Sequence, residues 1–400
     1  MTDLANPVPG RPEAGVVVAS SNAGPQKRAM PVGGEAAARE LTTAAAEFQR
    51  AALSAGTRRA YESDVRMFCR WLAGYTEKEP IPETLVEEQL SFPRSAKEVA
   101  EYLSEKALQR TAEDVPRYST ASVGRWVAAI AWAHHERGFR NPSADRQVTD
   151  TLNGIRRSAH RPTKRAAPLL VADLRKAVLA TDVTSFPADV KGTRDVALLV
   201  FGFAGAFRRS ELSDLLVGDV FLHQEDGLHV RLRSSKTDQE GRGQIKALPY
   251  GANSATCPPC AFRRWYGLLE AQEQGRPEVM RALRGQDLAL HVCQDPWTGS
   301  LRGRAPLFRA MAKTGTIRAT AVQGDAIGRV VTERAHAAGI PAANITGHSL
   351  RSGFVTQAIR AGATDHQIMR QTGHKNPATV HVYARENAPL EQNAVTTLGL

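Results

Sequence analysis

Residues 347–353 read GHSLRSG, residues 372–377 read TGHKNP, and Tyr383 stands nine residues after the histidine of the second segment. His348 and Arg351 are three positions apart, so their side chains are neighbours if this segment is helical. A His-x-x-Arg pair alone is a weak signal, because a surface helix can display it without any function. The pattern becomes informative because both segments and the tyrosine occur together.

The second segment predicts a break between two helices. Gly373 can end one helix in a left-handed conformation, Asn376 can cap the next helix, and Pro377 fits its first turn. We therefore expect Tyr383 on a short helix that begins beside the preceding histidine. A half-buried tyrosine that packs against Val380 is the alternative interpretation of the same residue.

Residues 204–212 read AGAFRRSEL and follow an apolar stretch around Phe201. The pattern places Arg208 at the end of an apolar helix and Glu211 three positions later. An apolar helix that ends on a charged residue often simply meets solvent there. If Arg208 is buried instead, Glu211 can hold its guanidinium in an orientation that faces a phosphate.

Residues 228–250 predict a β-hairpin with a polar turn at residues 238–241. The apolar residues that alternate along it are Leu228, Val230 and Leu232, then Ile245, Leu248 and Tyr250. Lys236, followed by a threonine, lies at the turn end of this hairpin. The rest of the chain from residue 166 has a helical pattern, so this region is expected to be mainly α with a small antiparallel sheet.

The sequence of the N-terminal half predicts a tail, a helical domain and a linker. Residues 1–41 hold almost no large apolar side chains and are expected to be a disordered tail. Residues 42–157 have a helical pattern and are expected to form a helical domain. Its apolar stripes are interpreted as core, and its last strong helix is expected at about residues 119–135. Residues 158–165 are a basic linker, and residues 166–400 form the second domain with a C-terminal tail.

The composition favours a polyanionic partner. The 400 residues contain 52 Lys and Arg against 41 Asp and Glu, which gives a net charge of +11. No apolar stretch approaches the length of a membrane span, and no signal peptide is apparent, so a soluble cytoplasmic protein without a membrane partner is expected. Four cysteines are too few to staple a secreted fold of this size, which favours a reducing compartment.

These segments, in this order and at these spacings, resemble the tyrosine recombinase (phage integrase) family over roughly residues 45–390. The resemblance implies a helical core-binding domain followed by an α+β catalytic domain. It also implies a DNA strand transferase that exchanges strands between two sites through a 3′-phosphotyrosyl intermediate. No cofactor, metal or ATP is expected. The expected partners are double-stranded recombination sites, bound by a homotetramer, and the expected location is the nucleoid in the cytoplasm. A role in a mobile genetic element is a further expectation.

Carried over residue by residue, the resemblance implies a catalytic set of Arg208, Lys236, His348, Arg351, His374 and Tyr383, supported by Glu211. Tyr383 is the expected nucleophile and Lys236 the expected general acid for the departing 5′ oxygen. Two guanidiniums can clamp the phosphate oxygens where other phosphoryl-transfer enzymes use metal ions. The residues expected to contact DNA are Arg125, Arg156, Arg157, Arg161, Lys164 and Arg165.

Three alternatives stay open. A DNA-binding regulator could keep the fold without catalysis, and a type IB topoisomerase shares the same chemistry. Cys257-Pro258-Pro259-Cys260, with His291 and Cys293 further on, could supply four ligands to zinc. The two prolines equally suit the entry to a helix, and this second interpretation is preferred from the sequence.

The end of the chain carries a prediction about assembly. The last residues include Val395, Leu398 and Leu400, which are apolar and poorly placed for a free terminus. Together with the resemblance, this predicts that residues 384–400 dock onto a neighbouring protomer in a ring of four. A frayed terminus is the alternative.

Overall fold

The structure is a computed structural model that describes residues 52–76, 79, 92–158, 165–233, 243–295, 299–341, 343–391 and 393–398. The expected disordered tail at residues 1–41 lies outside the described residues, as do Lys236, Arg161 and Lys164. Within the described ranges, no helix has the length and apolar character needed to cross a membrane.

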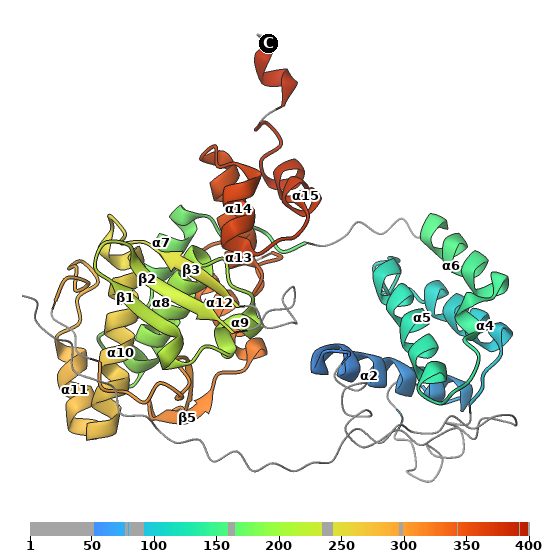
Figure 1. Cartoon of the computed structure of the whole chain (residues 1–400), viewed down its shortest axis with the longest axis horizontal. Coiled ribbons are helices and arrows are strands. Elements are labelled where there is room, and N and C mark those ends of the chain that lie inside the picture. Colours follow the sequence, from blue (N-terminus) through green and yellow to red (C-terminus); the bar gives the residue numbers. More distant parts are fainter. Residues whose placement is uncertain are drawn as a thin grey trace, which may run out of the picture. The chain divides into compact units, whose positions relative to one another are not determined.

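An N-terminal helical part covers residues 55–158 (Figure 1). Its elements are α2 (Ala55–Leu72), α4 (Ala96–Leu108), α5 (Thr120–His135), the 3-10 helix η1 (Pro142–Ala144) and α6 (Arg146–Ser158). The hydroxyl of Ser119 accepts a hydrogen bond from the backbone of Ser122 and caps α5, which begins and ends close to the predicted bounds.

Aromatic side chains fill the core of this helical part. Phe68 and Tyr102 are fully buried and meet edge to face at a centroid distance of 5.1 Å, and Trp126 packs on Tyr102. Val65 is buried on the same helix as Phe68, so the prediction that this apolar stripe of α2 forms core is confirmed. Each such side chain contributes about 1.5–3 kcal/mol through burial.

The C-terminal part covers residues 165–398 and consists of helices around two small sheets (Figure 1). Its helices are α7 (Val171–Leu179), α8 (Ala188–Ala204), α9 (Arg209–Ser213), η2 (Val217–Asp219), η3 (Ser254–Thr256), α10 (Pro258–Gln274), α11 (Arg276–Arg284), α12 (Gly324–Ala337), α13 (Ser349–Arg360), α14 (Asp365–Thr372), α15 (Pro377–Asn387) and η4 (Ala394–Thr397). Its strands are β1 (Val220–His223), β2 (Gly227–Leu232), β3 (Gln244–Leu248), β4 (Arg309–Met311) and β5 (Ile317–Ala321). The predicted fold class, mainly α with a small antiparallel sheet, is confirmed.

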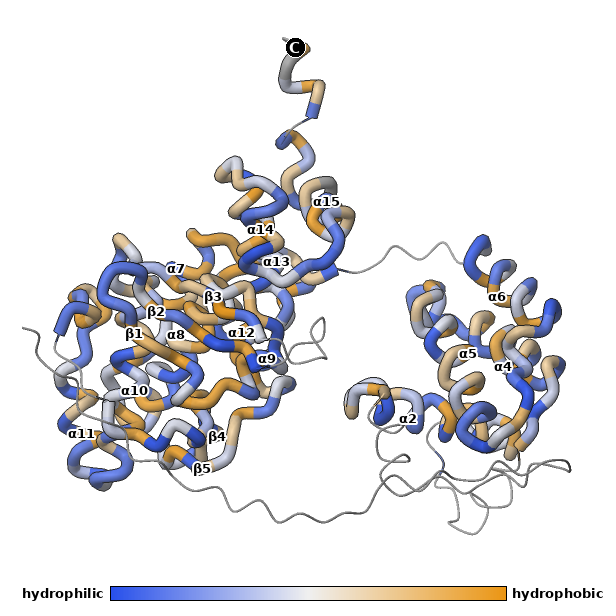
Figure 2. The backbone as a smooth tube through the Cα atoms, viewed as in Figure 1, coloured by the Kyte–Doolittle hydropathy of each residue, from blue (hydrophilic) through white to orange (hydrophobic). Residues whose placement is uncertain are grey.

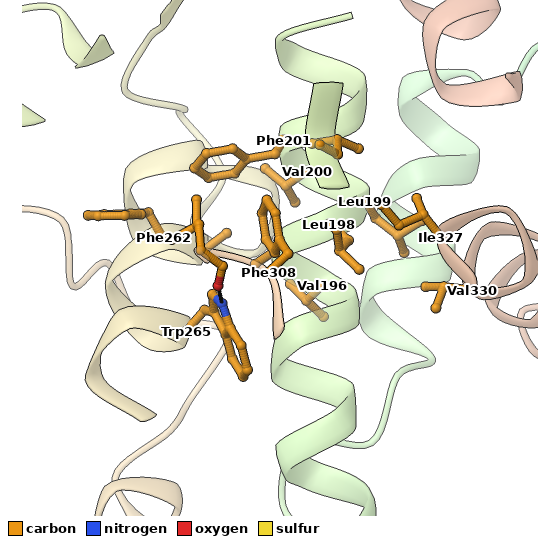
Figure 3. Packing of buried hydrophobic residues seen from close by; sticks show 14 of the residues in the cluster. Val196, Leu198, Leu199, Val200, Phe201, Phe262, Trp265, Phe308, Ile327 and Val330 are labelled. Carbon is orange, nitrogen blue, oxygen red and sulfur yellow. Dashed lines mark hydrogen bonds between the residues drawn. The ribbon is translucent and has the colours of Figure 1, made fainter. Parts of the chain in front are cut away.

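Helix α8 runs through the core of the C-terminal part. Phe201 on α8, Phe262 on α10 and Phe308 pack together (Figure 3). The indole N–H of Trp265 donates to the carbonyl of Leu307 at 2.8 Å, so this fully buried side chain keeps a polar partner. Figure 2 shows hydrophobic residues concentrated in this interior and hydrophilic residues along outer helices such as α11. Helix α8 is therefore well packed, and it supports the residues that follow its C-terminal end.

The predicted hairpin exists as β2 and β3, and β1 pairs antiparallel with β2 to complete a sheet of three strands. The sequence reading of β3 was wrong in detail. Ile245 is 65% exposed, and β3 ends before Tyr250. The core-facing positions are Leu248 and, two residues earlier on the same face, Lys246. The strands β1, β4 and β5 were not predicted.

Candidate active site

The last residue of α8, Ala204, and the residues up to α9 form a segment, called the Arg208 loop, that presents Arg208. Three consecutive backbone carbonyls in it accept hydrogen bonds from side chains of three different elements. Gln371 donates to Ala204 at 2.8 Å, Lys246 to Gly205 at 2.7 Å, and Arg351 to Ala206 at 2.6 Å. Ala206 adopts a φ of 47°, a left-handed conformation that costs a non-glycine residue about 1 kcal/mol or more. The three donors hold the loop in this conformation.

Arg208 occupies the N-cap position of α9 and is paired with Glu211. The Glu211 carboxylate accepts from the backbone N–H of Arg208 at 2.9 Å and also from its guanidinium. Glu211 is almost fully buried, whereas the side chain of Arg208 remains 20% exposed. Burial alone would raise the pKa of Glu211, but Lys246 and Arg208 together hold it below its usual range. Glu211 therefore stays ionised and orients the arginine.

Lys246 is a buried lysine beside the pair formed by Arg208 and Glu211. Its Nζ lies 3.7 Å from a Glu211 oxygen and 4.5 Å from the centre of the Phe207 ring. Burial lowers the pKa of Lys246 to about 7, against the opposing effect of Glu211. Sequence reasoning missed this residue. The available signal was its position two residues before Leu248, which places the lysine on the core-facing side of β3.

Arg351 lies in the first turn of α13 and is 1% exposed. One of its terminal nitrogens, Nη1, binds the Ala206 carbonyl, while Nη2 is buried and has no hydrogen-bond partner among the described residues. Burial, and then the charge of Arg208, lower the pKa of Arg351 to about 10, so the guanidinium is still charged at neutral pH. A buried donor without a partner is costly and marks a position for a missing acceptor.

Gly353 allows α13 to approach the segment that precedes α7. A Cβ at this position would lie 1.9 Å from the carbonyl oxygen of Leu169. The same contact includes a backbone hydrogen bond of 3.0 Å from Leu169 to Ser349. The glycine of the GHSLRSG segment therefore has a packing role, and it fixes the helix that carries Arg351.

The break predicted between two helices is confirmed. Gly373 ends α14 with a φ of 71°, and Asn376 caps α15 by accepting from the backbone of Ala378 at 2.8 Å. Pro377 occupies the first turn of α15. Tyr383 therefore lies on a short helix, as expected.

The hydroxyl of Tyr383 meets the imidazole of His348. The Nε2 atom of His348 lies 2.8 Å from the hydroxyl oxygen. His348 is exposed at the start of α13, yet partial removal from water and then the charges of Arg351 and Arg208 lower its pKa. Tyr383 also packs with Val380 against the cluster that includes Ile368. The two interpretations of this tyrosine are compatible, because its ring packs while its hydroxyl reaches the site.

His374 completes the group. Its ring stacks near that of Tyr383 with centroids 6.2 Å apart, and its Nδ1 lies 3.0 Å from the hydroxyl of Thr372. Burial and the nearby cations, Arg351 first among them, lower the pKa of His374 to about 4. The structure thus brings together five of the six residues expected in the catalytic set, together with Glu211.

A cleft of about 680 Å³ opens beside this group. It is lined by His348, Tyr383, Thr346 and the exposed Arg165 among others. Arg165 belongs to the expected DNA-binding set, and the structure places it in the lining of this cleft. The cleft is therefore lined by both an arginine and the tyrosine that contacts His348.

The other expected DNA contacts lie in the N-terminal helical part. Arg156 and Arg157 are exposed in the last turn of α6. Arg125 forms a two-pronged ion pair with the buried Asp64 at 2.7 and 3.0 Å, although half of its side chain remains exposed. Its role toward DNA stays a prediction, as do the roles of Arg161, Lys164 and Lys236.

Comparisons with known proteins agree with this geometry. The family model described as the phage integrase family matches residues 318–389, which include His348, Arg351, His374 and Tyr383. An integrase/recombinase xerD homolog of Selenomonas ruminantium is 28% identical over 344 residues, which covers 86% of this chain and 85% of the relative.

Solved structures show weaker likenesses. The XerH site-specific recombinase bound to palindromic difH substrate is 15% identical, with a TM-score of 0.48 over 79% of this chain and 78% of that chain. The Tn1549 transposon integrase in complex with transposon right end DNA is 14% identical, with a TM-score of 0.46 over 89% of this chain and 98% of that chain.

The comparisons indicate a tyrosine site-specific recombinase: residues 318–389 match the phage integrase family model, and the similarity to the xerD homolog covers 86% of the chain.

Proposed function

We propose that this recombinase cleaves DNA by attack of Tyr383 on a phosphodiester. The observation that carries the proposal is the 2.8 Å distance between His348 Nε2 and the Tyr383 hydroxyl. The lowered pKa of His348 keeps its ring neutral at neutral pH, so Nε2 can accept the phenol proton. As the bond from the tyrosine oxygen to phosphorus forms, the bond from phosphorus to the 5′ oxygen breaks. A 3′-phosphotyrosyl bond and a free 5′ hydroxyl result.

Arg208 and Arg351 stabilise the charge that develops on the non-bridging oxygens. The unpartnered Nη2 of Arg351 supports this role, because a phosphate oxygen would satisfy a donor that is otherwise buried without an acceptor among the described residues. Two fixed guanidiniums supply what metal ions supply in other phosphoryl-transfer enzymes. The reaction is therefore proposed to need no divalent metal.

His374 changes its protonation state when a phosphate binds. The single hydroxyl proton of Thr372 goes to the carbonyl of Ile368 at 2.8 Å, so this hydroxyl can only accept from His374 Nδ1. The neutral ring then carries its proton on Nδ1 and leaves Nε2 as an acceptor. To donate to a phosphate oxygen, His374 must take up a second proton, which a bound anion favours by raising its pKa.

Lys236 is proposed as the general acid that protonates the departing 5′ oxygen, on the strength of the family resemblance. Lys246 has a different position. It is 1% exposed, and its Nζ is engaged by the carbonyl of Gly205 and by Glu211. This arrangement suits a residue that positions the Arg208 loop rather than one that touches DNA.

Rejoining needs no ATP in this proposal. The phosphotyrosyl bond conserves the energy of the broken phosphodiester, and a 5′ hydroxyl from a second site reverses the step. Four protomers hold two sites, with residues 384–400 docked onto a neighbour. The support for docking is the exposure of apolar side chains near the chain end, 63% for Leu390 and 67% for Leu398.

Both parts of the chain are proposed to bind the same duplex. The net charge of +11 and the exposed Arg156, Arg157 and Arg165 support phosphate contacts from each part. DNA affinity should then fall steeply with salt, because each neutralised phosphate releases counterions. An affinity that does not change between low and physiological salt would exclude this mode of binding.

The experiment that tests the function incubates the purified chain with the DNA that flanks its own gene. Covalent adducts are trapped in denaturing gels, and new junctions are sequenced. We expect a protein-DNA adduct and precise exchange between two sites. Relaxation of supercoils without exchange would assign the chain to topoisomerase activity, and binding without an adduct would assign it to regulation.

A further inference from the structure

Four potential metal ligands gather at the N-terminal end of α10, on elements other than those that carry the catalytic set. Cys257 occupies the N-cap position of α10 and Cys260 lies in its first turn, so the two cysteines stand on either side of the two prolines. His291 and Cys293 lie on the segment that follows α11. One ligand atom from each of the four residues lies within 4.8 Å of all the others.

The separations between His291 and two of the sulfurs fit a tetrahedral ion. His291 Nδ1 lies 3.3 Å from the sulfur of Cys260 and 3.6 Å from the sulfur of Cys293. Zinc binds sulfur at about 2.3 Å and nitrogen at about 2.0 Å, so a tetrahedral site separates a sulfur from a nitrogen by about 3.5 Å. These two sulfur–nitrogen separations thus already match those that an ion between the side chains requires.

The surroundings favour sulfur as a metal ligand. The backbone N–H of Gly251 donates to Cys257 Sγ at 3.3 Å, and that of Val292 donates to Cys260 Sγ at 3.4 Å. These donors, and the N-terminal end of α10, face the sulfurs with positive charge. Cys257, Cys260 and Cys293 are buried, whereas His291 is exposed.

The segment that carries two of the ligands is held in place by contacts other than the ligands. Arg264 on α10 donates to the carbonyls of Asp287 at 2.7 Å and Leu290 at 2.5 Å. Ser254 donates to the carbonyl of Leu288 at 2.7 Å. The ligand positions are therefore preorganised, which lowers the entropic cost of binding an ion.

We propose that Cys257, Cys260, His291 and Cys293 bind one structural zinc ion. Three thiolates and an imidazole in tetrahedral array select zinc, and four protein ligands leave no open position for catalysis. The ion ties the entry of α10 to the segment after α11. Because α10 packs on α8 in the main core, the site braces the helix that leads to the Arg208 loop.

The test measures zinc in the full-length protein, purified under reducing conditions without chelator. We expect one zinc per chain by elemental mass spectrometry. Cys260→Ser and His291→Ala should each lower zinc affinity at least about tenfold. The exposed ring of His291 makes the second variant the safer test of binding, because its loss disturbs the core least.

Matched controls come from outside the cluster. Cys69→Ser removes the remaining free cysteine, which is buried in α2. His229→Ala removes a histidine from the exposed group formed with His223 and Asp226. Both controls should retain zinc. Cobalt substituted for zinc should give the visible absorption of tetrahedral thiolate ligation, and this absorption should be lost with His291→Ala or Cys260→Ser.

A wild-type protein that stays free of zinc after reconstitution under reducing conditions would overturn the proposal. So would equal loss of zinc from the control variants and the cluster variants. A disulfide between Cys257 and Cys260 in the reduced preparation, detected by thiol counting, would also replace the zinc site with a redox pair.

Discussion

The Nε2 atom of His348 and the hydroxyl of Tyr383 are 2.8 Å apart, although 35 positions separate the two residues along the chain. The contact requires α15 to stay packed on α13. The hydrophobic cluster that includes Val355, Ile368 and Val380 holds the helices together. The contact between His348 and Tyr383 therefore depends on a small apolar cluster that lies next to the polar site.

Tyr383→Phe should leave DNA binding nearly unchanged and abolish the covalent adduct, because only the nucleophilic oxygen is removed. Electrophoretic mobility shifts measure binding, and denaturing gels measure the adduct. Tyr250→Phe is the matched control, since its hydroxyl donates to the carbonyl of His223 away from the site. The assignment of the nucleophile is falsified if the Tyr383 variant still forms the adduct.

Arg351→Lys should reduce the cleavage rate by about 10²–10³-fold, because a lysine keeps the charge but loses the planar fork. The substitution also leaves the Ala206 carbonyl without its donor, so thermal unfolding is measured alongside cleavage. Arg175→Lys, at an exposed position of α7, is the control. A cleavage rate within about threefold of wild type would contradict the proposed clamp.

A substrate with sulfur at the bridging 5′ position should restore cleavage to Lys236→Ala, because a thiolate leaves without needing a proton. The same substrate should fail to rescue Lys246→Met, whose defect is the loss of support for the Arg208 loop. Single-turnover cleavage rates with oxygen and sulfur substrates give the comparison. Rescue of the Lys246 variant alone would transfer the role of general acid to Lys246.

The DNA-free protein should become less stable as the pH falls from about 6.5 to about 4, in part because of His374. Its pKa is about 4 in the folded state and 6.5 in the reference state. Within this window the unfolded chain binds a proton at His374 that the folded chain does not, so protonation favours unfolding. Urea unfolding at several pH values measures the slope.

His374→Gln should flatten this slope. Bound DNA should also flatten the slope, since a phosphate beside the ring raises the pKa of His374. If His374→Gln unfolds with the pH dependence of the wild type, the histidine does not titrate in this way.

Truncation after Asn387 should preserve binding of one protomer to a single site and weaken the paired complex. The truncated chain keeps the carbonyl of Asn387, which accepts from Arg360 at 2.8 Å, so α15 retains its C-terminal contact. Sedimentation on DNA with one or two sites measures assembly. Recombination at the wild-type rate by the truncated chain would remove the segment after Asn387 from the mechanism.

Sequence patterns predicted the local elements well. The break at Gly373, the cap at Asn376 and the start of α5 follow from turn and capping chemistry, which acts over a few residues. The expectation that Arg208, His348 and Tyr383 meet came from family resemblance, because no local rule brings distant segments together.

The contacts that hold the Arg208 loop were not predictable in this way. Gln371 and Lys246 donate hydrogen bonds to backbone carbonyls. Every residue has a backbone carbonyl, so the sequence does not indicate which of them accepts such a bond. A lysine in a strand is normally taken to face solvent. Only its spacing of two residues from Leu248 indicates that Lys246 faces the core. The short strands β1, β4 and β5 give too few alternating residues to stand out from loops.

The three consecutive carbonyls of the Arg208 loop have a further consequence for control. Gln371 belongs to α14, the helix that leads through Gly373 into the tyrosine helix, so one segment both carries the proposed nucleophile and supports the arginine. A displacement of that segment would move the Tyr383 hydroxyl away from the site. The same movement would remove the support of the Arg208 loop. Attack and charge stabilisation would therefore be lost together in a resting protomer, because both depend on the placement of one segment.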